Sequence, residues 1–149
     1  MALPRMTIQI EGTAADHGLV RLVDFIEQLE TFKAVLRRRT ERGGYYRVVD
    51  LRHDSPATVV LEYVRGSKEA PSRKAPAIEA MMQDLSRIQQ TTRKKPPVQD
   101  LDVLESYAEI AAAVEKRVNR IVVKASRRSV TIDESFSRKL TKLIGPDET

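Results

Sequence analysis

Alternating apolar and polar positions predict strands on both sides of a long helical segment. In "MTIQIEG" (residues 6–12), Ile8 and Ile10 alternate with polar neighbours, which is the period of a half-buried strand. "YYRVVDLRH" (45–53) and "ATVVLEYV" (57–64) are rich in valine, tyrosine and threonine, which suit a pleated surface. The turn residues "DSP" lie between the last two runs. These two runs therefore predict a hairpin.

The segment between the first strand and the hairpin carries a helical pattern. Thr13 and Asp16 have the spacing of a capping box, so the helix is expected to begin at this pair. "RRRTER" (37–42) makes a cationic last turn, and Gly43-Gly44 is a natural stop. Apolar residues at spacings of three and four form one continuous stripe along this helix: Leu22, Phe25, Ile26, Leu29, Phe32, Val35 and Leu36.

Three further helices and one or two strands are predicted after a polar linker at 65–76. Pro76 suits the first position of a helix, and Asp100 and Asp133 suit the N-caps of two later ones. "RIVVKASRRSVTID" (120–133) predicts one or two strands around a turn at 126–128. The apolar faces of the three helices are Ile78, Met81, Met82, Leu85 and Ile88; Leu101, Leu104, Ala108, Ala111, Val114 and Val118; and Phe136, Leu140, Leu143 and Ile144.

The predicted element order, β-α-β-β-α-α-β-(β)-α, indicates the α+β class, with an antiparallel sheet and helices mainly on one face. Without the extra helix and the last two elements, this is the βαββαβ order of a ferredoxin-like layer. Another α+β arrangement of the same elements is the alternative. The chain has no internal repeat and no low-complexity run.

Length and composition favour a single domain over residues 1–149, or the N-terminal domain of a longer protein. Aromatic residues make up 5% of the chain, so an aliphatic core is expected. The absence of cysteine excludes disulfides and thiolate chemistry. The N-terminus has no apolar segment of a signal peptide, and no run approaches the roughly 20 apolar residues of a membrane span. We therefore expect a cytoplasmic location and no membrane contact.

Charge is distributed unevenly along the chain, whose net charge is +5. Residues 37–95 carry a net charge of +7 and residues 119–142 a net charge of +5, whereas 96–118 carry −3. Such a distribution bears on the choice of partner more than the total does.

His53 and Asp54 invite comparison with metal phosphohydrolases that use a His…His-Asp…Asp series, here completed by His17 and by Asp100 or Asp102. Those hydrolases place their ligands on helices, whereas this pair lies between two predicted strands and just before Pro56. The residue before a proline is pushed away from helical angles. We therefore interpret the pair as part of a turn and His17 as a surface histidine.

Paired carboxylates offer no stronger chemistry. Glu105 and Glu109, like Glu27 and Glu30, fall on polar faces of predicted helices, where acidic residues keep the helix solvated. The chain contains neither GxGxxG nor GxxxxGK[ST]. We expect binding rather than catalysis, with no catalytic residue, no metal and no cofactor.

Three basic clusters are candidates for neutralising nucleic-acid phosphates. They contain no aromatic residue for base stacking, so such binding would contact the backbone with little sequence specificity. The candidate nucleic-acid-binding residues are Arg37, Arg38, Arg39, Arg42, Arg93, Lys94, Lys95, Lys124, Arg127 and Arg128.

Two features indicate protein contacts instead. The first helix shows part of a second apolar edge, at Leu19, Val20 and Val23. Met81-Met82 offers either an adaptable surface or ordinary core filler.

The acidic segment 96–118 and the basic segment 119–142 have complementary charges and would pair within one chain or between two copies. We therefore interpret the protein as a non-catalytic binding or assembly module that contacts a partner protein or its own copy, as a homodimer. A domain that binds DNA or RNA through its basic clusters is the alternative. Steep salt dependence would distinguish nucleic-acid binding from an apolar interface.

Overall fold

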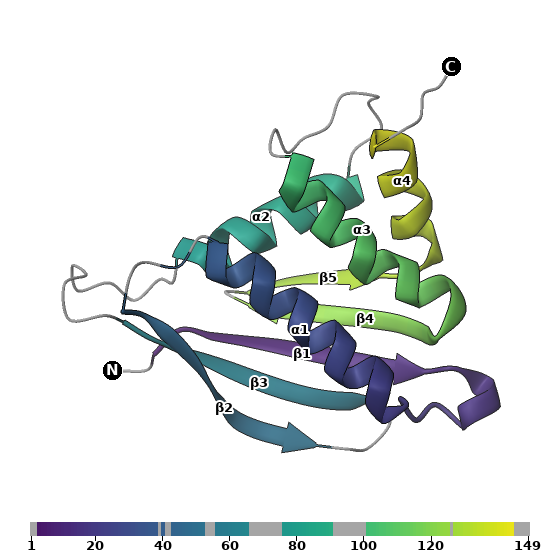
Figure 1. The fold of residues 1–149 in the computed structure, drawn as a ribbon, viewed down its shortest axis with the longest axis horizontal. Coiled ribbons are helices and arrows are strands. Elements are labelled where there is room, and N and C mark those ends of the chain that lie inside the picture. Colours follow the sequence, from purple (N-terminus) through teal and green to yellow (C-terminus); the bar gives the residue numbers. More distant parts are fainter. Residues whose placement is uncertain are drawn as a thin grey trace.

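Five antiparallel strands form one sheet in the computed structural model, which describes residues 3–38, 40, 43–52, 56–65, 76–90, 101–125 and 127–144. The strands lie in the order β2-β3-β1-β4-β5 (Figure 1). Their bounds are β1 Arg5–Gly12, β2 Tyr45–Arg52, β3 Ala57–Val64, β4 Val118–Ala125 and β5 Arg128–Ile132.

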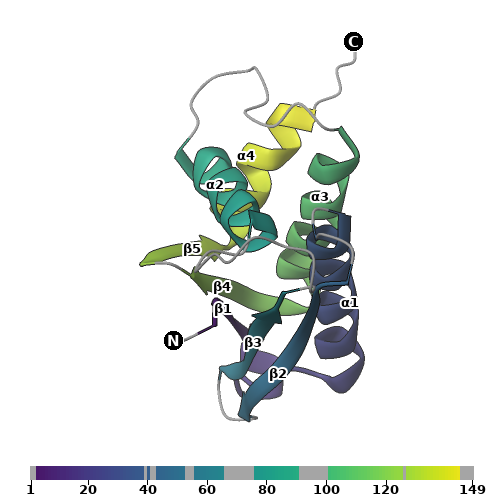
Figure 2. The same ribbon diagram turned by 90° about the vertical axis from the view of Figure 1, so that its left-hand side faces the viewer.

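Four helices cover one face of this sheet (Figures 1 and 2). They are α1 Leu22–Arg38, α2 Pro76–Gln90, α3 Leu101–Lys116 and α4 Glu134–Ile144. Helix α3 packs against α1 and α4, while α2 packs against α1, α4 and strands β4 and β5. The predicted α+β class, the element order and the one-sided helical layer are confirmed.

The order of strands β1 to β4 in the sheet defines a split βαβ core. Strand β1 lies between β3 and β4, with Ile8 opposite Val59 on one side and opposite Val123 on the other. The hairpin strand β2 adds to the far side of β3. This arrangement follows the ferredoxin-like order, and β5 extends it by pairing with β4.

The alternation predicted for β1 sorts its side chains onto two faces. Met6, Ile8 and Ile10 are fully buried beneath the helices, and Arg5, at the start of the strand, is exposed. The apolar face of α2 is buried as predicted, and it includes both Met81 and Met82. These methionines are core residues, which confirms the core-filler alternative and rules out the adaptable surface.

The start of the first helix differs from the prediction. Thr13 begins a short 3₁₀ turn (Ala14–Asp16) that ends at His17 in the left-handed region, with φ of 57°. Gly12 N then donates a hydrogen bond to Gly18 O at 2.8 Å, so the loop folds back against the end of β1. Helix α1 begins only at Leu22, because this loop interrupts the chain between the Thr13–Asp16 pair and the helix.

Later boundaries agree closely with the sequence pattern. Pro76 occupies the first position of α2, and Asp133 caps α4 by accepting a hydrogen bond from Phe136 N at 3.0 Å. The basic segment 119–142 contains two strands, β4 and β5. They pair with each other, beginning with Ile121 opposite Ile132. Val118 belongs to β4 rather than to the preceding helix. Asp100 lies outside the described residues.

Candidate interaction surface

The burial pattern at the start of α1 is inverted. Leu22 is 72% exposed and Ile26 is 50% exposed, although both belong to the predicted apolar stripe. Asp24 and Gln28 take the buried positions in these turns, each with 2% of its surface exposed. Farther along, Phe32, Val35 and Leu36 are buried as expected. The first half of α1 therefore presents Leu22 and Ile26 to the outside, while Phe25 and Leu29 of the same stripe pack against the core.

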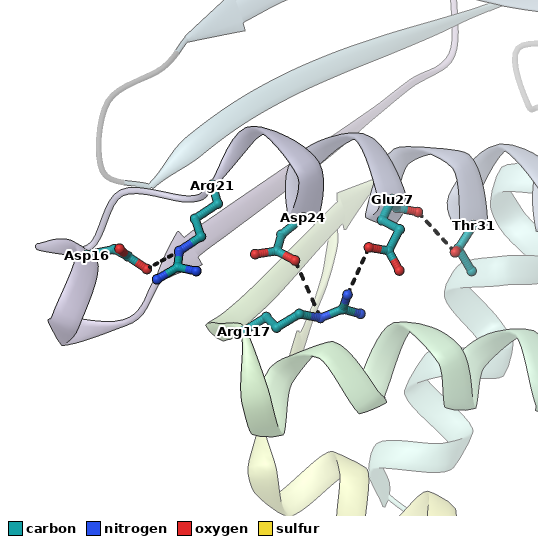
Figure 3. A network of polar contacts seen from close by, with 6 residues as sticks. All are labelled: Asp16, Arg21, Asp24, Glu27, Thr31 and Arg117. Carbon is teal, nitrogen blue, oxygen red and sulfur yellow. Dashed lines mark hydrogen bonds and ion pairs between the residues drawn. The ribbon is translucent and has the colours of Figure 1, made fainter.

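A polar network explains why this part of α1 turns Asp24 inward (Figure 3). Arg117, at the junction of α3 and β4, places Nε 3.4 Å from Asp24 Oδ1, which is an ion pair without hydrogen-bond geometry. Its Nη1 donates a hydrogen bond to Glu27 Oε2 at 2.8 Å. Arg21 pairs with Asp16 in the loop at 3.1 Å. Because Arg117 compensates a buried carboxylate, α1 is oriented by charge as well as by apolar packing.

A groove of about 320 Å³ lies between the start of α1 and the end of the β2–β3 hairpin. Leu51, which is 58% exposed, forms one wall of this groove, and Leu22 forms part of the opposite wall. We call this feature the apolar groove and define it by its lining residues: Leu19, Val20, Leu22, Phe25, Leu51, Arg52 and Ala57.

Two residues of the predicted second apolar edge, Leu19 and Val20, take part in this groove. Leu19 is brought there by the loop that folds back after Gly12. The loop lies so close to this glycine that a Cβ added to Gly12 would be 1.9 Å from Leu19 O. Val23 is 63% exposed on the same part of α1 but does not line the groove. Sequence alone indicated part of this surface and missed Leu51, because only the fold brings the hairpin beside α1.

Strand β2 forms one edge of the sheet and carries further apolar residues. Its register against β3 shifts between Val48 and Asp50, so Val49 is an extra residue in a bulge. Val48 and Leu51 consequently lie on the helix-facing side, opposite Leu61 and Val59 of β3. The side chains of Val48 and Leu51 nevertheless remain more than half exposed.

The other face of the same strands is held by ion pairs. Glu62 on β3 is buried between two arginines, and it accepts hydrogen bonds from Arg47 Nη2 at 2.6 Å and from Arg5 Nε at 3.0 Å. These two guanidinium groups, Arg47 foremost, hold the pKa of Glu62 below its usual value.

Similar pairing extends along this open face of the sheet. Arg52 Nε lies 3.2 Å from Asp50 Oδ2. Glu11 accepts hydrogen bonds from Asn119 Nδ2 and Arg120 Nε, which lower the pKa of its carboxyl group in that order. The arginines of the open face are thus largely neutralised by neighbouring carboxylates.

The predicted basic residues are placed in separate regions. Arg37 and Arg38 are exposed at the end of α1, whereas Arg127 and Arg128 lie at the β4–β5 turn. Figure 2 shows these two sites on opposite sides of the molecule, with α2 between them. Lys124 lies on β4 and is exposed. The remaining candidates lie outside the described residues: Arg39, Arg42, Arg93, Lys94 and Lys95.

The structure adds one basic residue that the sequence analysis did not select. Arg87 of α2 and Arg128 of β5 line the same polar hollow, whose volume is about 440 Å³. Arg127, next to this hollow, has a φ of 68°, which is uncommon for a residue with a long side chain.

Three of the other candidate catalytic or metal-binding residues lie on the surface. His17 is exposed, as are Glu105 and Glu109, whereas His53 and Asp54 lie outside the described residues. In the described part of the chain, no group of three or more metal-binding side chains occurs together. Within that same part, no helix has both the length and the apolar character needed to cross a bilayer.

Comparison of the chain with family models, with curated proteins and with solved structures finds no significant match. The function must therefore be inferred from the surfaces described above.

Proposed function

We propose that this protein is a non-catalytic binding or assembly module whose contact surface is the apolar groove together with the adjoining edge of β2. The observation that carries this proposal is the inverted burial at the start of α1. Leu22 and Ile26 are exposed while Asp24 and Gln28 are buried. The free energy falls when a partner removes exposed leucine and isoleucine side chains from water, so such a contact is favourable.

The geometry of the surface supports a macromolecular partner rather than a small substrate. Apolar side chains form both walls of the groove, and an outer strand with exposed valine and leucine lies next to it. An edge strand offers unpaired backbone N–H and C=O groups to another chain. Side chains on one face and backbone groups at the edge together provide both contact area and register.

Site-specific photo-cross-linking in cells tests this proposal. A benzophenone amino acid at Leu22 should cross-link a protein, whereas the same group at Arg138, an exposed position on α4, should not. Introducing Leu51→Asp should abolish the Leu22 product, because a charge in the groove opposes apolar docking. The proposal fails if position 22 yields no protein product, or if the product persists with Leu51→Asp.

Binding to a phosphate backbone is the second candidate. The observation that favours it is the pair Arg87 and Arg128 at one hollow, beside the strained Arg127. Arg127→Ala with Arg128→Ala should then remove binding of labelled DNA and RNA in an anisotropy titration over a salt series. Arg37→Ala with Arg38→Ala is the matched control on the other side. Equal loss with both double variants, or affinity that ignores salt, would contradict this candidate.

A further inference from the structure

We infer that the occupant of the apolar groove and the β2 edge is a second copy of this chain, paired antiparallel to β2 about a two-fold axis at Leu51. This inference rests on the proposed function, because it names the partner of the same surface. It depends on the register of β2, on the signs of its charges and on the position of its exposed leucine.

A symmetric pairing of two identical antiparallel strands places one residue opposite its own copy. Each residue before the axis then lies opposite the residue equally far beyond it, on the same face of the sheet. With the axis at Leu51, Asp50 of each copy lies opposite Arg52 of the other. Asp50 and Arg52 share the open face of the sheet, opposite Val60 and Thr58 of β3. The two contacts across the axis therefore join opposite charges.

Three other positions of the axis fit less well. An axis at Arg47 or at Asp50 would place two like charges directly opposite each other, which is destabilising. An axis at Val48 would pair Tyr46 with Asp50 across the bulge, although these residues belong to opposite faces. Residues 50–52 follow the bulge in regular register with β3, so the segment at the axis is an ordinary strand.

The helix-facing side supports the same axis. Leu51 is exposed there and lines the apolar groove with Leu19 and Leu22. Because Leu51 would lie at the axis, the grooves of both copies would adjoin each other and form one apolar surface. Charged pairs on the open face and leucines on the helix face would then specify the same register.

Disulfide trapping tests the register directly, since the natural chain contains no cysteine. In the Leu51→Cys variant the two Cα atoms would be about 4.5–5.5 Å apart, within the range that a disulfide requires. Val48→Cys is the matched control, because Val48 lies on the same strand and face and is 57% exposed. Its two copies would be about 20 Å apart. Mild oxidation should convert Leu51→Cys to a covalent dimer and leave Val48→Cys largely monomeric.

Sedimentation equilibrium of the full 149-residue chain tests the charge pairs. Asp50→Arg and Arg52→Asp should each weaken dimerisation about tenfold or more, and the double variant should restore it to within about threefold of the natural chain. The double variant keeps the ion pair within each chain as well as the pairs between chains. A double variant as weak as the single variants would overturn the assigned register.

The two proposals fail in different ways. A chain that stays monomeric up to about 100 µM, with no trapping of Leu51→Cys, overturns the second copy as occupant. If position 22 still cross-links another protein in cells, the groove remains a docking surface for a different partner. Equal trapping of Val48→Cys and Leu51→Cys would also overturn the inference, since it would show collisions without a fixed register.

Discussion

The two edges of the sheet are held in place by different interactions. Strand β5 is short, its Val130 and Ile132 are buried, and both α2 and α4 pack against it. Strand β2 is longer, and its apolar Val48 and Leu51 are more than half exposed. It is tied to its neighbours by the hairpin ladder and by the pairing of Arg47 with Glu62.

The two edges differ in how far they are shielded within one chain. Natural sheets shield an edge by shortening it, charging it or covering it. The β5 edge is short and its helix-facing side is covered by α2 and α4, whereas the β2 edge keeps a helix-facing apolar surface exposed. Burial stabilises the first edge, while ion pairs hold the second and leave its apolar side chains exposed.

The largest expected contrast comes from shortening one aliphatic side chain on each edge. Ile132→Ala should lower the free energy of unfolding by about 2–5 kcal/mol, because it removes buried methyl groups and leaves a cavity. Leu51→Ala should change it by less than about 0.5 kcal/mol in dilute solution, since Leu51 is exposed. Urea unfolding of both variants at low protein concentration measures this contrast, and equal losses would contradict it.

The ion pair that orients α1 beside the β2 edge should give the next largest effect. Arg117→Ala leaves the buried Asp24 carboxylate without its cation and should cost about 2–4 kcal/mol. Glu27→Ala removes the exposed partner of the same arginine and should cost less than about 1 kcal/mol. Thermal or urea unfolding would show the difference. Similar losses of stability in both variants would mean that the buried Asp24 carboxylate does not need Arg117 as its cation.

A smaller effect, of opposite sign, is expected at the turn that leads into β5. Arg127 has a positive φ, which glycine adopts without steric penalty. Arg127→Gly should therefore raise the free energy of unfolding by about 0.5–1 kcal/mol. Arg128→Gly, one residue later and inside the strand, is the control and should lower it. A loss of stability in Arg127→Gly would indicate that the arginine makes a compensating contact.

Acid should weaken the ion pair that ties strand β2 to β3. The folded pKa of Glu62 lies below its unfolded value, which is about 4.3 for a free glutamate. The stabilising effect is thus complete above that value and is lost as the pH falls through the folded pKa. Between pH 7 and pH 3, the unfolding free energy of the natural chain should fall more steeply than that of Glu62→Gln. Parallel curves for the natural chain and Glu62→Gln would contradict the assignment.

Local patterns predicted most of the fold because the interactions that decide each element are short-range. The alternation around Ile8, the proline at the start of α2 and the aspartate before α4 each define a strand or a helix end. The start of α1 was placed too early because Thr13 and Asp16 have the spacing of a cap but form a separate 3₁₀ turn. A glycine directly after His17 was the local signal for that break.

The candidate surface could be predicted only in part, since it depends on contacts between distant segments. The stripe containing Leu22 and Ile26 has the period of a buried face, and nothing local shows that Arg117 draws Asp24 inward instead. The meeting of Leu51 with the start of α1 likewise requires the folded sheet. The proposed nucleic-acid residues were chosen by charge, and charge does not determine whether clusters converge in space.

The central place of β1 also sets the order in which the sheet can be built during synthesis. This strand is made first, and it can pair with β3 once the hairpin has followed it. Its other side stays unpaired until β4 is made, because Thr7 pairs with Lys124 near the far end of the described chain. Such non-local pairing slows folding and prolongs the exposure of an unpaired strand on the ribosome. A nascent chain halted before residue 118 would therefore hold an apolar strand with no neighbour on one side, which is the kind of segment that chaperones bind.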